Sequence, residues 1–161
     1  MKTLFLVRHA KSSRDDPSLP DRGRPLDDRG KQDAPMMGKR LAKRDLKPDL
    51  LVSSPALRAL TTAQLIAEEV GYQRNHIVVD DRLYASSPDD VLDVIRALDK
   101  KVDRVMLVGH NPEFTDLAHR LSSKIIEMPT CAVAEFSFDT KAWSDLGEVE
   151  PAKVTMDCPR K

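Results

Sequence analysis

Four short runs of hydrophobic residues recur along the chain, and each has the length of a β-strand. They lie at residues 3–7, 50–52, 77–79 and 105–108, and segments with helical periodicity separate them. Continuous apolar runs of this kind are typical of strands in a parallel sheet, because such strands are buried on both faces. The pattern therefore predicts buried parallel strands joined by helices.

The segment after the second run has the clearest helical pattern. Ser54 and Pro55 are expected to supply its N-cap and first helical residue, and Gly71 is expected to end it. Apolar residues at helical spacing predict that one side of this helix packs against the sheet. The residues on that side are Ala59, Ala63, Ile66, Ala67 and Val70.

Two further helices have start signals of their own. Residues 87–90 read Ser-Pro-Asp-Asp, which resembles a capping box, and Asn111 with Pro112 opens the other segment. A helix before the second run is expected to reach about Arg44. Because Pro35 lacks a backbone N–H, we expect it in the opening turn of that helix, with Asp33 as the cap.

The pattern becomes β-like after Pro129. Residues 132–138 and 152–156 are predicted strands separated by a loop at 143–150, and they are expected to complete the sheet, one at an antiparallel edge. Strands that alternate with helices form right-handed crossovers and a sheet covered on both faces. The predicted fold class is α/β, a three-layer α/β/α sandwich with a mostly parallel sheet.

The composition fits one soluble domain and excludes several classes of function. The 161 residues predict a single domain, and 26 basic against 26 acidic side chains lack the basic excess of general nucleic-acid binders. No apolar run is long enough for a membrane span, and Arg8 and His9 interrupt the first run too early for a signal peptide. We therefore expect a cytoplasmic protein that binds neither nucleic acid nor membrane. Cys131 and Cys158 lack the spacing of a zinc site or a disulfide framework.

Basic side chains follow three of the predicted strands. Arg8 and His9 follow the first, Arg58 lies just after the second, and His110 follows the fourth. The carboxyl ends of parallel strands meet at one edge of a sheet, where helix N-termini also favour anions. Arginine matches the oxygens of phosphate, and Arg58, in the first turn of its helix, is unfavourably placed unless an anion compensates its charge. These residues predict a phosphate-handling site.

The two histidines add nucleophilic chemistry to this site. A neutral imidazole can attack phosphorus through one ring nitrogen when the other donates its proton to an acceptor such as a backbone carbonyl. Such a reaction requires no metal and no cofactor. The remaining histidines, His76 and His119, lie outside the strand ends, and we interpret them as surface or structural residues.

Several motifs, taken together and in this order, resemble those of the histidine phosphatase superfamily and, within it, the small SixA-like phosphohistidine phosphatases. The resemblance spans most of the chain and implies a phosphoglycerate mutase-like fold, as one histidine phosphatase domain over residues 1–161. Its carriers are Leu-Val-Arg-His-Ala-Lys-Ser at 6–12, Arg-Pro-Leu at 24–26 followed by Arg-Gly at 29–30, Ser-Ser-Pro-Ala-Leu-Arg-Ala at 53–59 with Thr-Ala at 62–63, Leu-Tyr-Ala-Ser at 83–86, and Val-Gly-His-Asn-Pro at 108–112.

The resemblance also implies a role for each matched residue. His9 would be the nucleophile that becomes phosphorylated, and Arg8 and Arg58 would hold the phosphoryl group. His110 would be the second histidine in contact with that group, and Arg24 would line the pocket as an additional basic residue.

The sequence departs from the larger family members at two points. Ala85 stands where phosphoglycerate mutase-like relatives have a glutamate that serves as general acid, and little chain is left for a sizeable cap insertion. We therefore expect an open pocket that admits a side chain of a folded partner. Lys11, Ser12 and Arg24 are candidate phosphate or substrate ligands, with solvated loop residues as the alternative for all three. Candidate substitutes for the missing acid are Asp16, Asp21, Asp81 and Asp89.

The predicted function is a metal-independent phosphatase that removes phosphate from phosphohistidine in a protein, such as a histidine-containing phosphotransfer domain. A leaving imidazole is readily protonated, whereas the alkoxide released from a phosphate ester needs a proton in the transition state. Two alternatives remain open. One is a phosphatase of small phosphate esters or other phosphoproteins with the same mechanism, and the other is a non-catalytic phosphate-binding protein.

Overall fold

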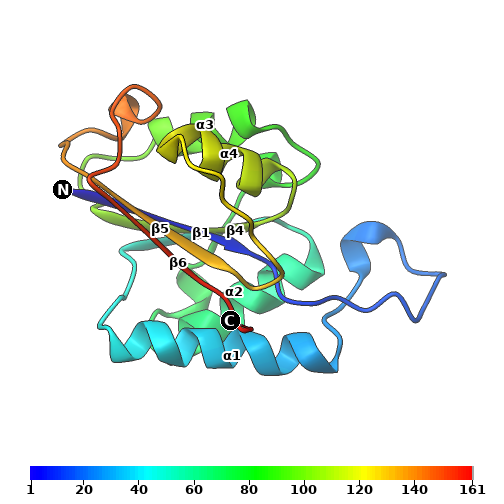
Figure 1. Ribbon diagram of the computed structural model, residues 1–161. Coiled ribbons are helices and arrows are strands. Elements are labelled where there is room, and N and C mark those ends of the chain that lie inside the picture. The colour runs from blue at the N-terminus through cyan, green and yellow to red at the C-terminus, as the bar shows by residue number, and fades with distance from the viewer. Residues whose placement is uncertain (161) are drawn as a thin grey trace.

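A single mixed sheet forms the centre of the fold. The structure is a computed structural model that describes residues 1–160, and within them six strands pair in the order β3-β2-β4-β1-β5-β6 (Figure 1). Their bounds are β1 Lys2–Arg8, β2 Leu50–Ser53, β3 Val78–Val79, β4 Arg104–Gly109, β5 Val133–Phe138 and β6 Lys153–Asp157.

The pairing is parallel in one half of the sheet and antiparallel in the other. β1, β4, β2 and β3 pair in parallel, as the apolar runs predicted. β5 pairs antiparallel with both β1 and β6. The two C-terminal strands therefore complete the sheet as expected, but the strand that runs against all the others is β5, inside the sheet, rather than the edge strand β6.

Helices cover both faces of the sheet. α1 (Asp28–Lys43) and α2 (Leu57–Val70) lie on one face, and α3 (Pro88–Arg96) and α4 (Glu113–Ser122) on the other (Figure 1). Alternate residues of β1 divide between two cores: Leu4 and Leu6 join the one that contains Phe114 of α4, and Phe5 and Val7 join the other. This confirms the three-layer α/β/α sandwich. No helix among the described residues is long and apolar enough to cross a membrane.

Two expectations about the sheet and first helix are wrong. β3 is not buried: Val78 and Val79 are 46% and 47% exposed, because β3 is a short strand at the edge of the sheet. α1 begins six residues earlier than expected, and the carboxylate of Asp27, not Asp33, accepts from the backbone N–H of Gly30 at 2.8 Å. Pro35 consequently lies inside α1, where it removes one intrahelical hydrogen bond.

The other helix signals are mostly confirmed. Ser87 forms a capping box at the start of α3, and Gly71 ends α2 with φ at +78°. α2 starts later than expected, however. Its first residue is Leu57, and Ser54 does not serve as its N-cap.

The segment between β1 and α1 carries a 3₁₀ turn, η1 (Asp21–Gly23), and is anchored by a close approach to α1. Asp27 N–H donates to the carbonyl of Lys11 at 3.0 Å. A Cβ at Gly30 would lie 2.2 Å from that same carbonyl oxygen, so only glycine fits there. This contact holds the two ends of the segment together, Lys11 after β1 and Gly30 at the start of α1.

We predict that Gly30→Ala lowers the free energy of unfolding by about 1–3 kcal/mol, because the added methyl group forces the Lys11 backbone away from α1. Urea denaturation measures the change. Gly23→Ala is the matched control, since the nearest atoms to its Cβ lie at an ordinary 3.5 Å. Equal unfolding free energies for the two variants would show that the segment does not depend on this contact.

Candidate active site

One open pocket lies at the carboxyl ends of β1, β2 and β4. It has a volume of about 380 Å³. It is lined by all seven residues that were predicted to be catalytic or to bind phosphate, namely Arg8, His9, Lys11, Ser12, Arg24, Arg58 and His110. The parallel strands therefore bring together residues that are far apart in the chain.

His9 is held tightly at the end of β1. Its backbone N–H donates to the carbonyl of Gly109 at 3.0 Å, and its carbonyl accepts from Cys131 N–H at 3.0 Å. The ring Nδ1 lies 2.7 Å from the carbonyl oxygen of Ala10, which can only accept. Nδ1 must therefore carry the proton, which leaves the lone pair on Nε2.

Burial keeps His9 neutral. The side chain is 7% exposed, and this desolvation lowers the pKa of His9 to about 3, with the positive charges of Arg58 and Arg8 acting in the same direction. A neutral imidazole with a fixed tautomer and a free Nε2 is a nucleophile at neutral pH.

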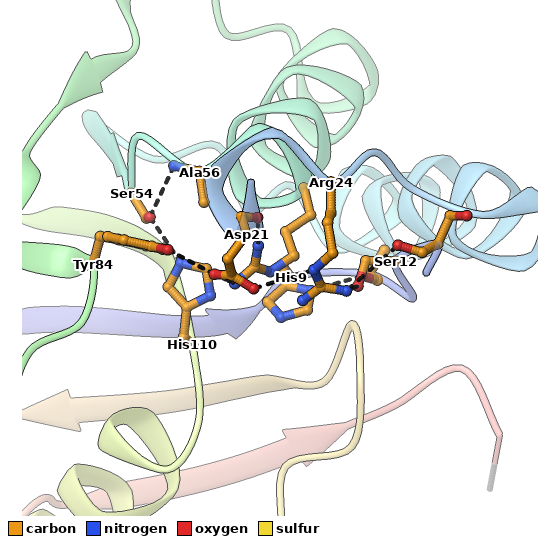
Figure 2. A network of polar contacts seen from close by, with 11 residues as sticks. His9, Ser12, Asp21, Arg24, Ser54, Ala56, Tyr84 and His110 are labelled. Atoms are coloured by element: carbon orange, nitrogen blue, oxygen red, sulfur yellow. Dashed lines mark hydrogen bonds and ion pairs between the residues drawn. The ribbon is translucent and has the colours of Figure 1, made fainter. Parts of the chain in front are cut away.

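His110 lies beside His9 but makes different contacts. The two ring centroids are 5.1 Å apart. Nε2 of His110 pairs with Oγ of Ser54 at 2.7 Å, and Nδ1 is buried without a partner among the described residues. Burial, followed by the charge of Arg58, lowers the pKa of His110 to about 4. Ser54, expected to cap α2, instead orients this ring (Figure 2).

The two arginines differ in how their charges are compensated. Arg58 is 6% exposed and donates through Nη1 to the carbonyl of Asp21 at 2.7 Å and through Nη2 to its carboxylate at 3.0 Å. Arg8 donates to the carbonyl of Met128 at 3.1 Å, and no carboxylate among residues 1–160 pairs with it. Burial lowers the pKa of Arg8. Both Nε atoms are buried and have no partner in the described part of the chain, so hydrogen-bonding capacity remains unused.

Asp21 is the anion of the pocket. Its carboxylate accepts from Tyr84 Oη at 2.6 Å, Arg58 Nη2 at 3.0 Å and Arg24 Nε at 3.1 Å (Figure 2). The hydrogen bond from Tyr84, followed by those from Arg58 and Arg24, holds the pKa of Asp21 well below its usual range. Arg24 also donates to Oγ of Ser12 at 2.9 Å. The segment before α1 thus supplies a permanent negative charge.

The remaining carboxyl groups singled out from the sequence do not enter the pocket. Asp16 hydrogen-bonds Ser18, and Asp81 and Asp89 pair with other exposed arginines, namely Arg22 and Arg120. Ala85 lines the pocket, so no carboxyl is present at that position.

Sequence reasoning assigned no role in the pocket to five residues that line it. They are Arg14, Tyr84, Asn111, Glu113 and Thr130. The sequence does carry one signal for Glu113, which lies one helical turn after His110 in the first turn of α4. Nothing in the local sequence points to Thr130, because the segment before β5 reaches the pocket only through the fold.

Comparisons with known proteins agree with this geometry. The sequence profile of the histidine phosphatase superfamily (branch 1) matches residues 4–85. An uncharacterized protein of Mycobacterium tuberculosis is 32% identical over 135 residues, which cover 80% of this chain and 77% of that protein.

Solved structures extend the likeness to the whole fold. A candidate phosphohistidine phosphatase SixA from Agrobacterium tumefaciens superposes with a TM-score of 0.80 at 27% identity, covering 96% of this chain and 97% of that one. A protein histidine phosphatase SixA complexed with tungstate superposes with a TM-score of 0.79 at 21% identity, covering 96% and 94%.

We predict that the rings of His9 and His110 stay neutral in the free protein from pH 8 down to about pH 5, because burial lowers both pKa values. Long-range ¹H–¹⁵N NMR of the imidazoles measures this, with assignments from the two single alanine variants. His9 is expected to show the Nδ1–H tautomer. A protonation midpoint near the ordinary histidine value for either ring would contradict the prediction.

Proposed function

The chain belongs to the histidine phosphatase superfamily, and from that premise we propose that it is a SixA-like phosphatase that removes the phosphoryl group from phosphohistidine in a protein. One observation carries the proposal. His9 is neutral, its tautomer is fixed by the carbonyl of Ala10, and it lies in the same pocket as the buried Arg58 and the partly buried Arg8.

The arginines and His110 bind the phosphoryl group. Arg8 has no carboxylate partner among the described residues, and Arg58 exchanges its contact with Asp21 for contacts with phosphate. Guanidinium groups offset the charge on the equatorial oxygens as phosphoryl transfer proceeds. The ring of His110 lies next to that of His9, with centroids 5.1 Å apart, and contacts the same phosphoryl group.

The reaction proceeds in two steps. The lone pair of His9 Nε2 attacks phosphorus, the bond between phosphorus and the substrate imidazole breaks, and that imidazole keeps the electron pair and takes up a proton from the solvent as it leaves. Water then attacks the phosphohistidine on His9, which releases inorganic phosphate and restores the free ring. Neither step calls for a metal ion, because the attacking nitrogen needs no deprotonation and the arginines offset the charge of the phosphoryl group.

The open pocket supports a protein substrate. The pocket is partly open to the surface, so a histidine ring on the surface of a folded partner can enter. Ala85 provides no proton at its position, which a leaving imidazole tolerates better than an alkoxide. A histidine-containing phosphotransfer domain has a substrate side chain of this kind.

We predict that the chain takes up ³²P label from a phosphohistidine protein in the presence of a metal chelator and then releases it, and that His9→Ala takes up none. Rapid quench, with a test for acid-labile and base-stable label, measures the transfer. His76→Gln, a histidine outside the pocket, is the matched control and is expected to behave as wild type. Transfer to the His9→Ala variant would exclude His9 as nucleophile.

The same assay separates the alternatives. Hydrolysis of p-nitrophenyl phosphate without label transfer from phosphohistidine would favour phosphate esters as substrates. Phosphate binding without turnover of either compound would favour a binding protein.

We predict that Arg58→Lys lowers kcat by about 10²–10³-fold, since a lysine ammonium cannot replace the paired donors of the guanidinium in the transition state. Steady-state kinetics with either substrate checks this. Arg74→Lys, on the exposed surface away from the pocket, is the control. Retention of wild-type kcat by Arg58→Lys would show that Arg58 supplies charge alone.

A further inference from the structure

The pocket contains a second carboxyl group that the steps above do not use. Of the described residues that line it, only Asp21 and Glu113 carry carboxyl groups. Asp21 accepts hydrogen bonds from three cationic or phenolic donors, so it is held ionised and has no proton to give. Glu113 is the carboxyl group that remains.

Glu113 is positioned by the same turn that positions His110. It is the first residue of α4, three residues after His110, and Phe114 N–H donates to the carbonyl of His110 at 3.0 Å. Glu113 therefore lines the pocket from α4, whereas Ala85 borders it from the segment before α3. Ala85, which stands where larger relatives have an acidic residue, and Glu113 therefore line the same pocket.

The surroundings of Glu113 favour the protonated form. Glu113 is 8% exposed, and no cation among residues 1–160 forms an ion pair with it. Burial raises its pKa, and Asp116 on the same helix acts in the same direction, against the opposing effect of its own backbone N–H. The other charged or titratable groups that line this pocket are Arg8, His9, Lys11, Arg14, Asp21, Arg24, Arg58, Tyr84 and His110.

We propose that Glu113 is the proton donor to the leaving group, an inference that rests on the proposed function because His9 must form the bond to phosphorus. As the bond between His9 Nε2 and phosphorus forms, the bond from phosphorus to the leaving atom breaks, and that atom keeps the electron pair and takes the Glu113 proton. In the second step the carboxylate takes a proton from the attacking water. The bond between phosphorus and Nε2 then breaks, and its electron pair returns to His9.

A proton donor in this pocket widens the range of substrates. A leaving imidazole needs little help, whereas an alkoxide has to be protonated in the transition state. Glu113 therefore extends the activity to phosphate monoesters of poor leaving groups, such as aliphatic alcohols.

A series of leaving groups tests this role. With p-nitrophenyl, phenyl and alkyl phosphates, Glu113→Gln is expected to reduce kcat for the alkyl ester by about 10²–10⁴-fold and to change kcat for p-nitrophenyl phosphate only slightly. Glutamine keeps the size of the side chain but cannot donate this proton. Glu127→Gln, an exposed residue outside the pocket, is the control and is expected to match wild type on all three.

The pH profile provides a second readout. For the wild type, kcat/KM of the alkyl ester is expected to fall as pH rises through the raised pKa of Glu113, because the donor loses its proton. Glu113→Gln is expected to lack this alkaline limb. Glu113→Asp, which keeps a carboxyl group, is expected to retain the limb with reduced kcat, and it serves as the test variant if the glutamine variant does not fold.

The outcomes separate this inference from the proposed function. An equal loss on all three esters, no loss on any, or a wild type that cleaves only p-nitrophenyl phosphate overturns Glu113 as the donor, provided that His9→Ala is inactive. Activity of His9→Ala overturns the proposed function itself, whatever Glu113→Gln does.

Discussion

The register between β1 and β4 is the constraint on which the site depends. Val7 pairs with Val108 and Arg8 with Gly109, so His9 and His110 leave the sheet at the same level, with ring centroids 5.1 Å apart. A slip of one residue would turn every side chain of β1 to the opposite face. Because both faces of β1 are packed into separate hydrophobic cores, such a slip would move each side chain into the opposite core and disrupt the close packing of both. The cores thereby fix the distance between the two histidines.

The same register brings in Ser54 and concentrates positive charge. Ser54 N–H donates to the carbonyl of Val108 at 3.0 Å, which sets the Ser54 hydroxyl 2.7 Å from Nε2 of His110. A buried and a partly buried arginine beside two buried histidines would be costly if all four side chains were charged. Desolvation keeps the histidines neutral, and Asp21 compensates Arg58. The close approach of Gly30 to Lys11 anchors the segment that carries Asp21. This contact therefore helps to hold the negative charge of Asp21 beside Arg58.

The sequence predicts those features that depend on short-range pattern. The strand ends that carry His9 and His110 follow from continuous apolar runs, and the order of the motifs identifies the family. Features that depend on long-range placement could not be predicted in this way. An apolar run such as Ile77 to Val79 does not reveal that its strand lies at an edge, and Ser54 has the residue type of a helix cap but bonds a histidine 56 positions away. The helix start at Asp27 was missed because the rest of α1 compensates for the hydrogen bond that Pro35 removes.

Asp21 and Glu113 show why residue type alone does not assign a role. Both are carboxyl groups in one pocket, but Asp21 accepts hydrogen bonds from three side chains, whereas Glu113 is buried at the start of α4 and forms no ion pair with a cation among the described residues. Donors stabilise the ionised form and lower the pKa of Asp21, whereas desolvation favours the neutral form and raises the pKa of Glu113. Environments that separate two such pKa values provide one group that binds cations and another that can carry a proton. The fold determines this difference. The donors to Asp21 come from α2, from the segment before α3 and from its own segment, and none of these donors forms a hydrogen bond with Glu113 in the described part of the chain.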